Sequence, residues 1–209
     1  MSVRATECRP DEAIVDGSST ALLRLQASIR SCVRCPRLVR CRSRVVPGDG
    51  NVPADVMFVG IAPGRFGGDR TGRPFNGDRS GKLLWEMIQR CGFARTFITN
   101  LVRCNPRDAA GRNRDPTADE IQRCRSHLQA EIALARPRIV VCLGRLAWRY
   151  LAGRSVSFNP RRAEPVKIGH LLLFPMYHPA YVNRGAYPRR SYLNDFDRLS
   201  GFVRRFVSV

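Results

Sequence analysis

Four cysteines of this chain are spaced so that their thiolates can converge on one metal. Cys32 and Cys35 form a C-x2-C pair, Cys104 follows an apolar run, and Cys124 lies in a helix-like segment. Eight cysteines without an export signal are expected to be reduced thiols, which favours metal ligation over disulfides. Zinc and a [4Fe-4S] cluster accept the same four ligands, so the spacing predicts a metal site and leaves the metal open.

The elements that must position these thiols alternate along the chain. Strand-like apolar runs are expected at residues 56–61, 97–102, 139–143 and 171–176, and helices at residues 81–90, 117–134, 145–151 and 193–206. Thr117 with Glu120 three residues later predicts a capping box at one helix start. We therefore expect an α/β fold, a three-layer αβα sandwich with a mostly parallel sheet of about four strands.

The domain organisation follows from length and periodicity. Residues 1–20 carry no sustained period and are expected to form a flexible arm, with helical spacing from Ala21 onward. The 209 residues suit one compact domain over residues 21–209. No apolar run is long enough to cross a membrane and no signal peptide is apparent, so a cytoplasmic protein is expected.

The charge of the chain predicts a polyanionic partner. Its 36 basic residues against 17 acidic ones give a formal net charge of +19, which also repels a second copy and favours a monomer. Nearly all the basic residues are arginines, whose planar fork suits phosphates.

Four stretches in order resemble the iron-sulfur members of the uracil-DNA glycosylase superfamily, between the fourth and fifth families and closer to the fifth. The stretches are Cys32-Val-Arg-Cys-Pro-Arg-Leu-Val39, Gly60-Ile-Ala-Pro-Gly64 running on to Thr71-Gly-Arg-Pro-Phe-Asn-Gly-Asp78, Thr99-Asn-Leu-Val-Arg-Cys104, and His178-Pro-Ala180. The resemblance covers roughly residues 30–205. It implies excision of uracil from DNA and a [4Fe-4S] cluster held by Cys32, Cys35, Cys104 and Cys124.

The same resemblance assigns a base pocket. An extruded base must be stacked and read along its Watson-Crick edge. Phe75 resembles the stacking aromatic, Asn100 the amide that pairs with uracil N3-H and O4, and His178 the imidazole that stabilises the departing base. Each has a plainer reading, respectively a core ring, a loop cap and a structural histidine. Gly60, Ile61 and Gly64 complete the predicted substrate contacts.

The water-activating group is less clearly marked. The fourth family has an acidic residue where this chain has Ile61, which cannot accept a proton. Asp78 resembles the aspartate that the fifth family uses, with Asn113 as its partner asparagine, and Asp69 is the second candidate.

The segment after the histidine motif, residues 183–190, is expected to touch DNA. It reads either as a wedge whose arginines Arg184, Arg189 and Arg190 hold phosphates, or as a solvated loop.

The sequence as a whole predicts a monofunctional glycosylase acting on uracil-containing DNA. Neither lysine, Lys82 or Lys167, lies in a motif, which argues against a Schiff-base lyase step. The alternative is a cluster- or zinc-stabilised DNA-binding module without catalysis.

Overall fold

One six-stranded sheet runs through the described part of the chain, residues 17–207 of a computed structural model. Its strand order is β1-β3-β2-β4-β6-β5. The four central strands are parallel and coincide with the four predicted runs: β2 (Val56–Gly60), β3 (Thr96–Asn100), β4 (Ile139–Leu143) and β6 (Leu171–Met176). The predicted α/β class is confirmed.

The prediction of about four strands omitted the two sheet edges. The strands β1 (Asp49–Gly50) and β5 (Val166–Ile168) pair antiparallel with β3 and β6. Both are too short to carry a recognisable alternation of apolar residues, and they end the sheet without a long unpaired edge.

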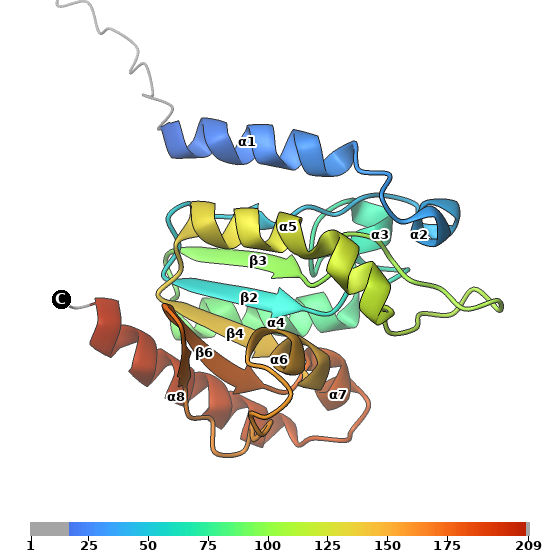
Figure 1. Cartoon of the computed structure of the whole chain (residues 1–209). Helices are drawn as coiled ribbons and strands as arrows, with labels where there is room; N and C mark the ends of the chain where they lie inside the picture. The colour runs from blue at the N-terminus through green and yellow to red at the C-terminus, as the bar shows by residue number, and fades with distance from the viewer. Residues whose placement is uncertain (1–16, 208–209) are drawn as a thin grey trace, which may run out of the picture.

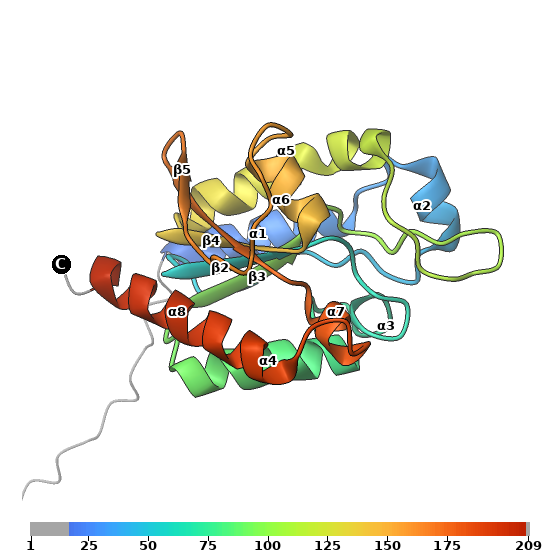
Figure 2. The same ribbon diagram turned by 90° about the horizontal axis from the view of Figure 1, so that it is seen from below.

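Helices cover both faces of the sheet. The helices α1 (Gly17–Arg30), α5 (Ala118–Ala135) and α6 (Arg145–Leu151) lie on one face, and α4 (Arg79–Cys91) and α8 (Arg189–Val207) on the other (Figures 1 and 2). Each face has its own apolar core, because strands buried on both sides carry apolar residues at nearly every position.

Three short helices fall in segments for which no helix was predicted. They are α2 (Pro36–Cys41), α3 (Gly68–Thr71) and α7 (Pro179–Asn183). At four to six residues each, they are too short for a hydrophobic period to mark them. All three are positioned at the carboxyl ends of the central strands, at the right of Figure 1.

The first helix begins earlier than expected. It starts at Gly17, whereas helical spacing in the sequence begins at Ala21, so residues 17–20 are helical and not part of an arm. Residues 1–16 of the predicted arm lie outside the described residues. Within the part described, no helix has the length and apolarity to cross a bilayer.

Candidate base pocket and thiolate site

A cavity of about 320 Å³ opens at the carboxyl ends of the central strands. The predicted substrate residues Ile61, Gly64, Phe75, Asn100, Asn113 and His178 all line it, together with Asp78 and Arg184. Gly60 ends β2 immediately behind it, where a Cβ would lie 2.7 Å from the Phe75 ring and 2.5 Å from Asn100 Oδ1. A side chain at residue 60 would therefore displace both groups.

Asn100 offers an unused hydrogen-bond acceptor to this cavity. It ends β3, is 1% exposed, and its Oδ1 has no hydrogen-bond partner. A buried amide oxygen left unpaired costs stability, so such an atom marks a position where a ligand can supply the missing donor.

The backbone of Asn100 is fixed from behind by a buried ion pair. Arg103 Nη1 donates to the carbonyl oxygen of Asn100, and Arg103 Nη2 lies 2.6 Å from Glu131 Oε2. Both charged side chains are 1% exposed. Thr99 Oγ1 and the Gly48 amide also donate to the Glu131 carboxylate, which leaves the buried charges well hydrogen-bonded.

His178 is held as a neutral donor. It is the N-cap of α7, and its Nδ1 accepts a hydrogen bond from the Ala180 amide at 3.1 Å, which leaves the ring proton on Nε2. Burial, with the nearby Arg184 cation, lowers the pKa of His178 to about 4. The imidazole is therefore uncharged at neutral pH.

Phe75 faces the same space. Its ring centroid lies 5.5 Å from that of His178, and its side chain is 8% exposed. The backbone at Phe75 has a φ of +48°, a conformation that non-glycine residues rarely adopt. Strain of this kind is found where the surroundings hold a residue for a function.

Asp78 and Asn113 are positioned on either side of Gly64. Asp78 caps α4 by accepting from the Gly81 amide through Oδ1 at 2.8 Å, which leaves Oδ2 directed at the Gly64 loop. A Cβ on Gly64 would be 3.0 Å from Asp78 Oδ2 and 4.0 Å from Asn113 Nδ2. The missing side chain thus leaves a small space between a carboxylate oxygen and an amide nitrogen.

The structure removes Asp69 from the water-activating candidates. Asp69 is fully buried and does not line the cavity. Its carboxylate lies 2.5 Å from Arg107 Nη2 and accepts from the amides of Ser43 and Arg44. Asp69 therefore anchors the loop that carries Ser43 and Arg44. Its partners are far from it in the sequence, so the motif gave no sign of these contacts.

Sequence reasoning missed Asn105. This 1% exposed side chain lines the cavity, and its Nδ2 donates to the Pro63 carbonyl at 2.6 Å and to Asn113 Oδ1 at 2.9 Å. Its position directly after Cys104, in a loop leaving a strand, was the available signal. Asn105 ties the cysteine loop to the pocket wall.

The segment predicted as either a wedge or a solvated loop, residues 183–190, is mostly exposed and holds one buried aromatic residue. Tyr187, its aromatic residue, is only 7% exposed and packs with its ring centroid 4.4 Å from that of Tyr177. Arg189 pairs with Glu86. Arg184 lies at the cavity, and Arg190 is exposed. The arginines remain candidates for phosphate contact, whereas Tyr187 is not free to enter a duplex.

The four predicted thiol ligands gather beside the pocket from separate elements. Cys32 follows α1, Cys35 is the N-cap of α2, Cys104 follows β3 and Cys124 lies on α5. Burial raises the pKa of Cys35, and the nearby Cys124 and Cys32 thiols raise it further.

Backbone and arginine donors also reach these sulfurs. The Arg103 amide donates to Cys124 Sγ at 3.3 Å, and Arg42 Nη1 donates to Cys104 Sγ at 3.1 Å. Burial raises the pKa of Cys104 to about 11, although Arg42 opposes this rise. In residues 17–207, no three His, Cys, Asp or Glu side chains are already closed around a metal position. The nearby Cys32 thiol raises the pKa of Cys35, Cys104 and Cys124, so the four sulfurs lie close to one another, and a set of four thiols is the donor chemistry of a thiophilic metal centre.

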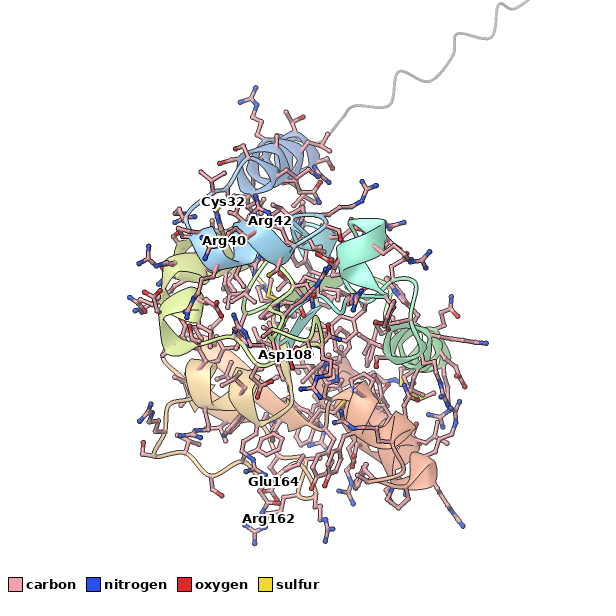
Figure 3. All side chains as sticks on the ribbon, turned by 90° about the vertical axis from the view of Figure 1, so that its right-hand side faces the viewer. Cys32, Arg40, Arg42, Asp108, Arg162 and Glu164 are labelled. Carbon is pink, nitrogen blue, oxygen red and sulfur yellow. The ribbon has the colours of Figure 1, made fainter. Side chains whose placement is uncertain are left out.

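Figure 3 looks onto this edge of the sheet. It shows Cys32, Arg40 and Arg42 on one side of the molecule, with Arg162 and Glu164 at the opposite side. The thiolate site is thus bordered by arginines on the face that also carries the pocket.

The fold and this site define an α/β protein with a small polar pocket at the carboxyl edge of its sheet and a cysteine cluster beside it. Comparison with known proteins makes the assignment specific. A model of the family described as "Uracil DNA glycosylase superfamily" matches residues 47–197. The chain belongs to this superfamily.

Its relatives include both of the types that the sequence motifs suggested. The type-4 uracil-DNA glycosylase of Thermotoga maritima is 35% identical, over 85% of this chain and 92% of the relative. The type-4 enzyme of Archaeoglobus fulgidus is 35% identical over 82% and 87%, and the type-5 enzyme of Pyrobaculum aerophilum is 35% identical over 73% and 80%. The predicted placement between the two types is confirmed.

Proposed function

We propose that this protein is a monofunctional uracil-DNA glycosylase, which extrudes uracil from DNA and hydrolyses its bond to the sugar. The observation that carries the proposal is the buried, unpartnered Asn100 Oδ1 facing the same cavity as Phe75 and His178. The alternative of a binding module without catalysis gives no reason to keep an unpaired amide oxygen at a cavity.

Base recognition follows from the chemistry of the amide. Asn100 Oδ1 accepts from uracil N3-H, and the amide nitrogen donates to O4. Cytosine has an acceptor at N3 and a donor at C4, so it would leave two buried polar groups facing like partners. The Phe75 ring lies against the base face.

Bond cleavage leaves the electron pair of the glycosidic bond on the uracil. The Nε2-H of His178 donates to uracil O2 and stabilises the negative charge that develops there, without having to lose or gain a proton. Because the Ala180 amide holds Nδ1 of the imidazole, the Nε2-H donor is in place before the reaction begins.

Water attack completes the hydrolysis. Asp78 Oδ2 and Asn113 Nδ2 border the space at Gly64, and we assign them to hold the water that adds to the sugar carbon. The carboxylate accepts a proton from this water as its oxygen bonds to the sugar. The released uracil anion takes a proton from solvent and Asp78 returns its proton to solvent, so the products are free uracil and an abasic site.

We further propose that Cys32, Cys35, Cys104 and Cys124 hold a [4Fe-4S] cluster. Four thiolate ligands would leave no open position for a substrate, so the cluster would supply structural support to the loop that carries Asn105 and follows Asn100 at the end of β3. Zinc is the alternative for the same ligands. Iron and sulfide analysis of the purified protein, with about four of each per chain expected, separates the two.

The partner is uracil-containing DNA, bound by a monomer in the cytoplasm. We assign three arginines to the flanking phosphates. Arg184 lies at the cavity after α7, and Arg189 and Arg190 begin α8. The ion pair between Arg189 and Glu86 must open for that residue to take part.

One incubation tests the activity. Purified protein is mixed with a DNA strand containing one uracil, and abasic sites are then cleaved with alkali. Strand cleavage that appears only after alkali is the expected result. Intact strands would overturn the proposal, and cleavage without alkali would indicate a lyase.

A further inference from the structure

Phe66 is the most exposed large hydrophobic side chain among the described residues, at 69%. It lies in the loop between β2 and α3, two residues after Gly64 and two before Gly68, and both of these glycines line the pocket. Covering a ring this exposed would remove apolar surface from water, which favours binding of a partner there.

The loop around Phe66 is fixed by hydrogen bonds on each side. The Arg65 amide donates to Asn113 Oδ1 at 3.1 Å, and Arg65 Nη1 donates to the Gly111 carbonyl at 2.9 Å. Arg70 Nε donates to the Phe66 carbonyl at 3.3 Å. The backbone that carries the ring is therefore fixed, in the segment directly before α3, and α3 lies at the carboxyl edge of the sheet (Figure 1).

One face of the ring is already occupied by a cation. The Arg65 guanidinium carbon lies 5.3 Å from the Phe66 ring centroid, within the range of a cation-π contact. The opposite face is left open by the ring's exposure. Single-stranded nucleic-acid sites stack bases on aromatic rings and add cation-π contacts from arginine, and Phe66 with Arg65 offers both groups.

We propose that Phe66 is a stacking platform for a base adjacent to the extruded uracil in the strand. This inference rests on the proposed function and assigns the strand a second base contact outside the pocket. Three observations favour a base as the occupant: the net charge of +19, the guanidinium behind the ring, and the two-residue distance from the pocket lining. The segment 183–190 offers no exposed ring of this kind, because its aromatic residue, Tyr187, is buried.

The platform makes a prediction about strand form. A base in a single strand gains a stacking partner from Phe66, whereas a base inside a duplex already has one. Phe66 should therefore strengthen binding of single strands more than binding of duplexes.

The test measures binding of a short single strand and of the matching duplex. Each carries one 2′-fluoro-2′-deoxyuridine, whose glycosidic bond resists cleavage. The proteins are the wild type and the variants Phe66→Ala, Phe66→Leu and Phe66→Tyr, with Leu23→Ala as the control, since Leu23 is 62% exposed on α1. We expect Phe66→Ala and Phe66→Leu to weaken single-strand binding about tenfold, and Phe66→Tyr and Leu23→Ala to bind like the wild type.

Two outcomes would overturn the platform. One is single-strand binding by Phe66→Leu equal to that of the wild type, because an aliphatic side chain offers no ring. The other is a loss confined to the duplex, which would indicate a wedge that separates base pairs. Release of uracil from ordinary substrate by the wild type reports on the proposed function independently, so the two can fail separately.

Discussion

Three side chains decide the chemistry of the pocket, and each is set by a local contact. The Ala180 amide fixes the tautomer of His178, Arg103 holds the carbonyl of Asn100, and Gly60 admits the ring of Phe75. All three side chains are uncharged at neutral pH. A site that donates and accepts through neutral groups suits a uracil ring, which is itself neutral until its bond breaks.

The pH dependence of catalysis tests the state of His178. Its folded pKa of about 4 lies below the ordinary value of 6.5, so the imidazole stays neutral as pH falls from 8 to about 5. We expect the single-turnover rate to show no acid limb near pH 6.5. An acid limb with that midpoint, absent from His178→Asn, would mean that the imidazole titrates at its ordinary pKa and is not held neutral by burial, whereas a rate that falls as pH rises through 6.5 would mean that the histidine works as a cation.

The Gly64 loop and the start of α4 form one unit around Asp78. A Cβ on Gly67 would overlap the Asp78 carboxylate, and Gly67 is itself buried. The same carboxylate caps α4 through the Gly81 amide. The carboxylate that caps the helix is thus also the one that we propose holds the water, so the helix fixes where its second oxygen lies.

Gly67→Ala tests this coupling. We expect the methyl group to displace Asp78 and to slow single-turnover uracil release about tenfold or more, with little change in DNA affinity. Gly201→Ala is the control, because no atom lies within 4 Å of its added Cβ. An unchanged rate in Gly67→Ala would show that the position of Asp78 does not limit the reaction.

Across the whole molecule, the pocket is anchored to the last helix through buried polar groups. Asp195 on α8 is 3% exposed, its Oδ2 has no partner, and Tyr187 hydrogen-bonds to its side chain. Tyr187 in turn packs on Tyr177, which precedes His178. Burial raises the pKa of Asp195 from 3.8 to about 6.

This buried carboxyl predicts how stability varies with pH. Because the folded pKa lies above the unfolded one, its contribution is full below about pH 4 and is lost as pH rises through about 6. Relative to the wild type, Asp195→Asn should gain about 1–3 kcal/mol of unfolding free energy between pH 5 and pH 8, measured in urea. Asp197→Asn, an exposed carboxylate paired with Arg90, is the control. Parallel pH profiles for wild type and Asp195→Asn would refute the assignment.

Much of the fold was predictable because its signals are local. The central strands appear as apolar runs, and the capping box of Thr117 and Glu120 is present as expected. The edge strands β1 and β5 were missed because two or three residues carry no period. The central strands and the capped start of α5 therefore followed from local sequence, whereas the edge strands depend on pairing with neighbouring strands.

The site was predicted where motifs name residues and missed where distant partners decide. Asn100, Phe75 and His178 line one cavity as expected. Asp69 was the second candidate for water activation and Tyr187 lay in the segment expected to touch DNA, but Asp69 pairs with Arg107 and Tyr187 packs on Tyr177, and both are buried. Such pairings depend on tertiary contacts between segments well separated in the chain.

In the proposed complex, one uracil ring is gripped by Asn100, Phe75 and His178. The most direct test compares single-turnover uracil release by the wild type and by Asn100→Ala from the same DNA. Losing the amide should lower the rate constant divided by the substrate half-saturation concentration about 10- to 100-fold, while metal content and DNA affinity stay those of the wild type. Equal rates in the two proteins would contradict the claim, because the base would then be read elsewhere.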